Sequence, residues 1–269
     1  MTIPSLFYKY RSFNALSERM LTHNELFLSS PRRFNDPLDC KLPPSYEKGT
    51  YEQIYNKNLE YLEITFPYLN SKERKIQAKR LSKEMYRNRN DQSRLKSFRQ
   101  EIIKSLCDSY GIFSMSSSCN NKLMWSHYAN SHSGFCVGLD GTKLFRFIDE
   151  YSFKHKVLLR IDKVLYQKEY PVINPYSMNE MEMFLSILLS KSTDWKYEQE
   201  YRLICAGHTD LKLIINPDLI ATVLLGAMIE RSNEEKMIKL LSNRSKRVLL
   251  FKGFYKEESF DLDFKKIEY

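Results

Sequence analysis

The sequence predicts an α+β fold with a mixed, largely antiparallel sheet, either continuous or split, flanked by helices and carrying a helical insertion. Segments with strand character outnumber the helical segments and do not alternate with them regularly, which argues against a doubly wound fold. Residues 46–108 are different, because they are polar, poor in glycine and helical in period. At 269 residues with 42% hydrophobic residues, the chain suits a single domain, residues 1–269, that contains this insertion.

The segment before the insertion predicts a strand, a helix, a second strand and a loop. Residues 6–10 alternate and are rich in aromatic side chains, which is typical of a strand. Leucine and methionine recur at helical spacing over residues 15–22, and residues 25–29 again have strand character. Two prolines and an Asn-Asp pair in residues 29–37 predict an ordered loop.

The segment after the insertion predicts more strands than helices. Helices are expected over residues 123–129, 179–191 and 236–241, the last after a capping box formed by Ser232 and Glu235. The predicted strands are residues 111–115, 134–139, 156–166, 201–206, 211–215, 221–225, 247–254 and 260–267.

Composition narrows the class of protein. No apolar run approaches the roughly 18 residues that a membrane helix needs, and no signal peptide is readable at the start of the chain. The five cysteines are dispersed without a Cys-x-x-Cys pair, which is typical of reduced thiols in a cytoplasm and gives no zinc-ligand spacing. We therefore expect a cytoplasmic protein with no metal and no membrane contact.

Positive charge is concentrated in one part of the insertion. Residues 71–105 hold twelve Lys or Arg against four acidic residues, which accounts for most of the chain's net charge of +9. This pattern is typical either of a solvated helix surface or of a surface that binds nucleic acid or an acidic protein. Aromatic residues are sparse there, so base stacking is not indicated. The candidate anion-binding residues are Lys79, Arg80, Lys83 and Arg87.

Two glutamates flank Gln199 immediately before an apolar strand. In extended backbone, Glu198 and Glu200 point to the same face, and Arg202 continues that face. Paired carboxylates repel, so either one keeps its proton or Arg202 relieves the repulsion. Such a pair suits the stabilisation of a developing cation or acid–base chemistry at a sugar carbon. The alternative is a surface ladder of ion pairs.

A second candidate stretch is aromatic. Trp125 and Tyr128 lie three residues apart on one predicted helical face, with His127 beside them. Together they are able to sandwich a flat heterocycle. The alternative is an aromatic plug between helix and sheet, with His127 hydrogen-bonded to backbone.

Two further candidates lie at strand ends. Arg11 closes the first predicted strand, where its guanidinium is able to fork onto a phosphate or carboxylate, or else simply lies exposed in a turn. Ser114 and Ser116 share one face of a later strand and suit ligand binding or loop capping. Neither is a predicted nucleophile, because no Gly-x-Ser-x-Gly segment surrounds them.

Four segments together resemble a bacterial domain-of-unknown-function family, number twenty-nine seventy-one. They are Tyr8-Lys-Tyr-Arg11, residues 28–39 (Leu-Ser-Ser-Pro-Arg-Arg-Phe-Asn-Asp-Pro-Leu-Asp), Met124-Trp-Ser-His-Tyr-Ala129 with His132 and Gly134, and Trp195-Lys-Tyr-Glu-Gln-Glu-Tyr-Arg202. This resemblance implies no activity.

The chain also resembles, more distantly, the ADP-ribosyltransferases of the arginine-serine-glutamate type. Their three signatures are an arginine that ends the first strand, a Ser-Thr-Ser-like strand, and a Glu-x-Glu before a late strand. Arg11, Ser114-Met-Ser116 and Glu198-Gln-Glu200 follow the same order. The sequence departs from the pattern at Met115, and Trp125 and His127 have no place in it.

The second resemblance implies NAD as substrate and gives each candidate a role. Glu200 would bond the ribose hydroxyl and stabilise the oxocarbenium ion, with Glu198 orienting the acceptor. His127 is a further catalytic candidate for which the resemblance has no role. Arg11 and Tyr10 would anchor NAD, and Ser114 and Ser116 would shape the nicotinamide pocket. Tyr128 or Trp125 would stack on the nicotinamide. Arg202 would bind the acceptor or an anion. Enzymes of this kind include toxins and phage-defence proteins.

Two alternatives remain open at this point. One is a nuclease or another hydrolase that uses His127 with Glu198 and Glu200, joined by Asp36 and Asp39 if a metal takes part. The other is a non-catalytic module that binds nucleic acid through the basic helices, with the aromatic segments as core.

Overall fold

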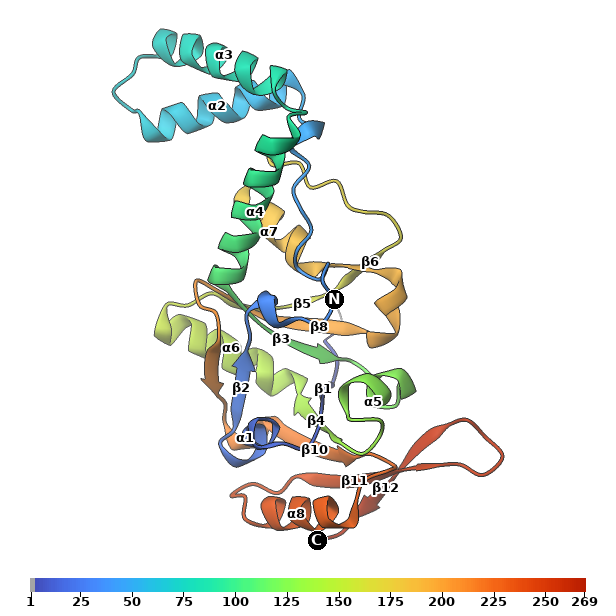
Figure 1. Cartoon of the computed structure of the whole chain (residues 1–269). Helices are drawn as coiled ribbons and strands as arrows, with labels where there is room; N and C mark the ends of the chain where they lie inside the picture. The colour runs from blue at the N-terminus through green and yellow to red at the C-terminus, as the bar shows by residue number, and fades with distance from the viewer. Residues whose placement is uncertain (1–2) are drawn as a thin grey trace. The chain divides into compact units, whose positions relative to one another are not determined.

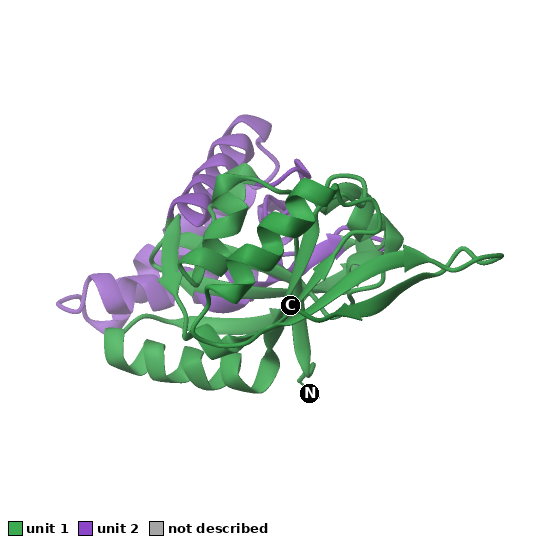
Figure 2. Cartoon of the chain, turned by 90° about the horizontal axis from the view of Figure 1, so that it is seen from below, with its two compact units in different colours: residues 1–33, 109–166, 192–269 green, residues 34–108, 167–191 purple. Residues whose placement is uncertain are grey.

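The computed structural model describes residues 3–269, and the chain forms two compact units (Figure 2). Unit 1 comprises residues 1–33, 109–166 and 192–269, and unit 2 comprises residues 34–108 and 167–191. The predicted insertion at residues 46–108 falls in unit 2, which is larger because it also includes residues 34–45 and 167–191. Every helix in the described part of the chain is too short or too polar to span a bilayer.

Unit 1 is built on one eight-stranded sheet with the order β12-β11-β10-β4-β1-β3-β8-β5 (Figure 1). Only β10 and β11 pair in parallel, so the sheet is mixed and mostly antiparallel, and the predicted α+β class is confirmed. A separate ladder joins β2 (Glu25–Leu28) to β9 (Leu211–Ile214). The strands of the large sheet are β1 (Leu6–Arg11), β3 (Tyr110–Ser116), β4 (Phe135–Asp140), β5 (Leu159–Lys163), β8 (Glu200–Ala206), β10 (Ile220–Leu225), β11 (Leu249–Tyr255) and β12 (Leu262–Ile267).

Helices cover both faces of this sheet. The main core joins one face to α1 (Ala15–Thr22), α6 (Gly141–His155) and α8 (Arg231–Ser242), and a smaller core joins the other face to α5 (Lys122–Tyr128). Strand alternation sorts the side chains between the two cores: Phe135 and Val137 lie in the main core, while Cys136 lies in the smaller one. Short 3-10 turns complete unit 1 at η1 (Pro31–Arg33), η3 (Thr193–Glu198) and η4 (Pro217–Leu219).

Unit 2 is mainly helical. Its elements are η2 (Tyr46–Lys48), α2 (Tyr51–Thr65), α3 (Ser71–Arg87), α4 (Gln92–Ser109) and α7 (Glu180–Leu189). Thr50 with Gln53 and Asn70 with Glu73 form capping boxes that start α2 and α3. The chain passes between the units after Arg33, near the end of α4, within β6 (Leu165–Gln167) and within β7 (Ser190–Ser192).

Two local predictions are wrong. The strand expected at residues 156–166 is instead a turn after α6, followed by β5 and the start of β6, and α6 was not predicted. Its start signal is Asp140, whose side chain accepts the Lys143 N–H. The capping box at Ser232 is also absent, because α8 already begins at Arg231 with Glu230 at the cap position.

Candidate functional site

Strand β1 pairs unequally with its two neighbours. With β4 it is registered along its whole length, from Leu6 opposite Asp140 to Arg11 opposite Phe135. With β3 it is registered at one position, where Tyr8 faces Ser116. Farther along, β3 instead exchanges two backbone hydrogen bonds between Ile112 and Ser29, of 2.9 Å and 3.0 Å. We call the place where the β1–β3 ladder stops, residues 9–11 of β1 and 114–116 of β3, the β1–β3 seam.

The register aligns three candidate side chains in a row across the sheet. Tyr8 on β1 lies opposite Ser116 on β3, and Ser116 lies opposite Glu200 on β8. Directly opposite residues project to the same face, so the three side chains leave the sheet on one side. Gly138 is the next residue in the row, and a Cβ there would lie 3.2 Å from the Tyr8 ring. Sequence analysis did not select Tyr8, because its partner in β3 is 108 residues away in the chain.

Glu200 is held by Arg202 inside the protein. Arg202 Nε donates to Glu200 Oε1 at 2.8 Å, and an Arg202 terminal nitrogen donates to Oε2 at 3.0 Å. The two residues share a strand face as predicted, but both are buried, so the alternative of a surface ion-pair ladder is wrong. The Glu200 N–H also donates to the Tyr166 hydroxyl at 2.8 Å. Because Arg202 is 0% exposed, its position suits fixing Glu200 rather than binding an external anion.

Glu198 reaches the same region by a different backbone path. It is the last residue of η3, and Gln199 follows in the left-handed region with φ of 46°. The extended geometry expected for this pair is therefore wrong, although both carboxylates are buried. The Tyr128 hydroxyl donates to Glu198 Oε1 at 2.6 Å. The Ser117 N–H donates to the Gln199 carbonyl at 3.1 Å, which ties this turn to the end of β3.

Lys9 occupies the β1–β3 seam. Its Nζ donates to the Ser114 carbonyl at 2.6 Å and lies 4.8 Å from the centre of the Phe113 ring. Burial and, to a smaller extent, the positive charge of Arg11 lower the pKa of Lys9 to about 7, although the charges of Glu200 and Glu198 oppose that shift. The charges of Arg11, Glu200 and Glu198 thus all change the pKa of this one ammonium group. Sequence analysis missed Lys9, although it stands two residues before Arg11 on the same strand face.

Arg11 does not share a face with Glu200. Alternation along β1 places Phe7, Lys9 and Arg11 on the side of the main core, which contains Phe7. The Arg11 guanidinium carbon lies 6.0 Å from the Phe113 ring centre. Burial lowers its pKa to about 10. Within residues 3–269, its Nε is buried without a hydrogen-bond partner, so the alternative of an exposed turn arginine is wrong as well.

Trp125 and Tyr10 are core residues. Trp125 is 0% exposed, and its Nε1 donates to the Cys119 carbonyl at 2.7 Å. Tyr10 meets the Trp125 ring edge-on at 5.2 Å between centroids, and its hydroxyl donates to the Ser118 carbonyl at 2.8 Å. The expectation that Trp125 stacks on nicotinamide is wrong for this structure, because the ring has no exposed surface. The aromatic-plug interpretation is correct for Trp125, whereas His127, which it expected to bond to backbone, is exposed, and Tyr10, expected to anchor NAD, is buried beside Trp125.

The exposed end of α5 carries the other two aromatic candidates. His127 is exposed, with its ring 6.2 Å from that of Tyr197, and Tyr128 is half-buried over Glu198. Asn121 lies at the opposite end of the helix, where its side chain caps the start of α5 and also donates to the Tyr197 carbonyl at 3.0 Å. Helix α5 is thereby tied to η3, so Tyr128 and His127 lie beside the Glu198 turn.

The serines and aspartates separate into different surroundings. Ser116 is 1% exposed, and its hydroxyl accepts the Ser118 N–H at 3.1 Å, while Ser114 lies opposite Arg202. Asp36 and Asp39 belong to unit 2, where Asp39 is ion-paired with Lys191 at 3.3 Å. Across residues 3–269, no group of three or more His, Cys, Asp or Glu side chains has the arrangement of a metal site.

Residues 124–203 match the model of a family described as "Protein of unknown function (DUF2971)", in agreement with the first resemblance found in the sequence. The matched segment contains Tyr128, Glu198, Glu200 and Arg202. Comparison with curated proteins and with solved structures found no match.

Proposed function

We propose that this protein cleaves the nicotinamide–ribose bond of NAD, as an NAD glycohydrolase or an ADP-ribosyltransferase. The observation that carries the proposal is the row Tyr8–Ser116–Glu200 on three adjacent strands, with the glutamate fixed by Arg202. The distant resemblance supplies the order of a first-strand residue, a serine and a glutamate. The register supports Tyr8, rather than Arg11, as the first member.

The chemistry needs a negative group beside the ribose. When the carbon–nitrogen bond breaks, its electron pair leaves with nicotinamide and positive charge develops on the ribose. A fixed carboxylate stabilises that charge, and removal of one such preorganised group typically costs roughly 3–4 kcal/mol of barrier. Water then adds to the ribose carbon and loses a proton, which gives ADP-ribose. In a transferase, a nucleophile on another molecule takes the place of water.

The surroundings of the two glutamates suit different tasks. Arg202 sets the orientation of the Glu200 carboxylate before substrate binds, so little reorganisation is needed as charge develops. Glu198, bonded to the Tyr128 hydroxyl, lies beside it and is assigned to the acceptor. The half-buried Tyr128 ring supplies an aromatic surface for nicotinamide.

The same proposal places the protein in the cytoplasm. All five cysteines are free, as expected where thiols stay reduced, and NAD is an intracellular substrate. Hydrolysis of NAD would deplete the cell of the dinucleotide, which is consistent with a toxin or phage-defence role.

The deciding experiment measures free nicotinamide after the full-length protein is incubated with NAD. Glu200→Gln is expected to lower the rate by about 100-fold or more. The matched control is Glu25→Gln, because Glu25 is another buried carboxylate of unit 1 held by an arginine, Arg19, outside the row. That control should keep the wild-type rate.

Loss of folding must be separated from loss of chemistry. Glu200→Gln leaves the Arg202 charge buried without its carboxylate, which destabilises a protein strongly. The double variant Glu200→Gln with Arg202→Met removes both charges, and it should recover a cooperative unfolding transition while remaining inactive. A folded Glu200→Gln protein that releases nicotinamide at the wild-type rate would overturn the assignment.

A further inference from the structure

Six cationic side chains share one exposed face of α3. They follow one another at intervals of one, three or four residues, which keeps them on one side of a helix, and they are Lys72, Lys75, Lys79, Arg80, Lys83 and Arg87. We call this set the α3 cationic face. Within residues 3–269, none of the six has a carboxylate within 4.0 Å.

Three arginines of unit 2 outside that face contrast with it. Arg74 pairs with Glu63 at 3.2 Å, and Arg99 pairs with Glu47 at 2.8 Å. Arg89 lies over the Tyr86 ring at 3.8 Å. Arginines that pack within unit 2 are therefore compensated, whereas the α3 cationic face presents its charge to solvent.

The helix that carries this face is held firmly. Asn70 and Glu73 form a capping box at its start, and Asn58 of α2 donates to the Ser82 hydroxyl at 2.9 Å. Ala78 is 0% exposed against α2. A rigid helix keeps the spacing of its cations. A ligand therefore binds without the loss of conformational entropy that ordering the helix would require.

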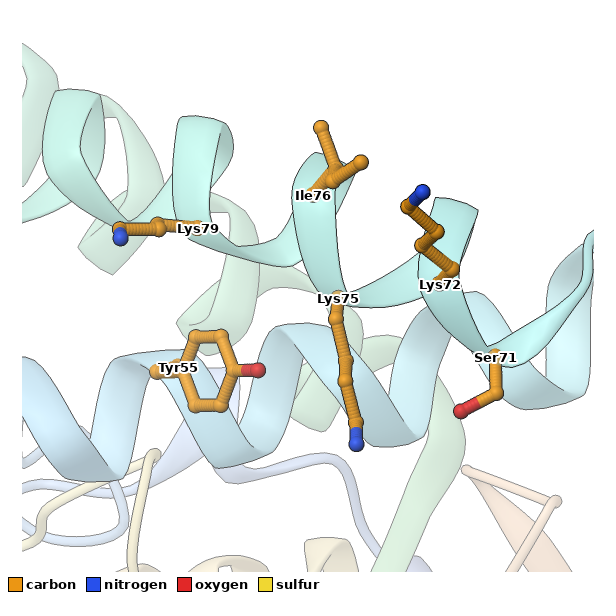
Figure 3. A pocket seen from close by; sticks show the side chains of 6 residues that line it. All are labelled: Tyr55, Ser71, Lys72, Lys75, Ile76 and Lys79. Atoms are coloured by element: carbon orange, nitrogen blue, oxygen red, sulfur yellow. The ribbon is translucent and has the colours of Figure 1, made fainter.

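A hollow of about 540 Å³ lies beside the face, between α2 and α3 (Figure 3). In Figure 3 the side chain of Lys75 extends from α3 towards α2 beside Tyr55, whereas Lys79 lies along α3. The lining is Tyr55, Ser71, Lys72, Lys75, Ile76 and Lys79. It combines ammonium groups with two hydroxyls, the donor set that hydrogen-bonds phosphate oxygens.

We propose that the α3 cationic face binds the phosphate backbone of duplex DNA, independently of the activity proposed for unit 1. From Lys72 to Arg87 the face extends about 22 Å along the helix, and duplex DNA offers one negative charge per about 1.7 Å of its axis. A B-form major groove admits an α-helix, whereas the narrow A-form groove of RNA does not. Tyr86, the aromatic residue of α3, has its ring covered by Arg89, so α3 itself offers no open ring for single-strand stacking.

The test measures how binding of a labelled mixed-sequence DNA duplex to the full-length protein depends on salt, by fluorescence anisotropy. One variant combines Lys75→Gln, Lys79→Gln, Lys83→Gln and Arg87→Gln, because glutamine keeps helix propensity. The matched control combines Lys154→Gln, Lys163→Gln, Lys239→Gln and Lys246→Gln, four exposed lysines of unit 1, so both variants lose four charges.

Each lost phosphate contact should reduce the slope of log K against log salt by about 0.9. The α3 variant should therefore lose about 3 to 4 from the slope and most of its low-salt affinity, whereas the control should lose less than about 1. The α3 variant should still release nicotinamide from free NAD at the wild-type rate, which separates the two proposals.

Three outcomes would overturn the assignment. Equal slopes for the two variants would mean that net charge alone attracts DNA. Tighter binding of an RNA duplex of the same length would point to a different nucleic acid. Displacement of DNA by polyglutamate at equal charge concentration would mean that the face fits an acidic polypeptide.

Discussion

Arg202 donates two hydrogen bonds to Glu200, two residues earlier on the same strand, and the two residues are only 0% and 4% exposed. Burying a charge pair costs desolvation of both groups, and well-packed apolar residues of similar volume are often at least as stable. Stability alone therefore gives little reason for this pair. What the pair does provide is a fixed orientation of the Glu200 carboxylate.

The first prediction concerns the stability of this pair. Arg202→Met should lower the free energy of unfolding by about 3–5 kcal/mol, because Glu200 would be buried without its partner. Arg19→Met is the comparison, since the Arg19 side chain is 35% exposed and its loss should cost less. Urea denaturation measures both, and an Arg202→Met protein as stable as wild type would contradict the arrangement.

The second prediction concerns pH and Lys9. Its pKa of about 7 in the folded protein lies below the ordinary 10.5, so between these values the unfolded chain binds more protons. The free energy of unfolding of wild type, relative to Lys9→Met, should therefore rise as pH increases from 7 towards 10.5. Denaturation curves at several pH values test this, with exposed Lys246→Met as a control that should show no such trend.

The third prediction concerns the hydroxyl of Tyr128. Tyr128→Phe removes the donor to Glu198, and a hydrogen bond to a charged group is worth about 1.5–3 kcal/mol. If Glu198 acts as proposed, nicotinamide release should slow by roughly tenfold or more, mainly in kcat. Tyr269→Phe loses a hydroxyl bonded to the Val248 carbonyl and should keep wild-type kinetics. If both variants have the same kinetics, the Tyr128 hydroxyl does not position Glu198 for the reaction.

The fourth prediction separates core from ligand surface at Trp125. Trp125→Phe opens space in the core and leaves the Cys119 carbonyl without its donor, so unfolding free energy should fall by about 1–3 kcal/mol. The KM for NAD should stay near its wild-type value. A raised KM at unchanged stability would instead indicate that Trp125 contacts the substrate.

Local patterns were sufficient for much of the fold. Alternating strands and helical periods predict the α+β class, and the i, i+2 relation between Glu200 and Arg202 holds because both lie in β8. Helix α6 was missed although Leu144 and Ile148 recur at helical spacing after the cap at Asp140. The turn at Glu198 was missed because Gln199 adopts a positive φ, which a glutamine in the sequence does not predict.

Long-range register set the limit for the site. The row of Tyr8, Ser116 and Glu200 depends on which strands become neighbours, and no local pattern encodes that choice. The same register decides that Arg11 leaves β1 on the other face. Lys9 was not predicted as a site residue because a single lysine in a strand usually lies at the surface. Its burial depends on which strands pack beside β1.

Strand β1 occupies the middle of the large sheet, yet its partners β3 and β4 begin at residues 110 and 135. During synthesis, about a hundred further residues must be translated before the first hydrogen-bonded neighbour of β1 exists, and its apolar and aromatic side chains stay unpaired until then. Folds dominated by such distant pairings form slowly and expose unpaired strands meanwhile. Pairing of β1 with its neighbours should therefore be a late step in the folding of unit 1 and should benefit from chaperones.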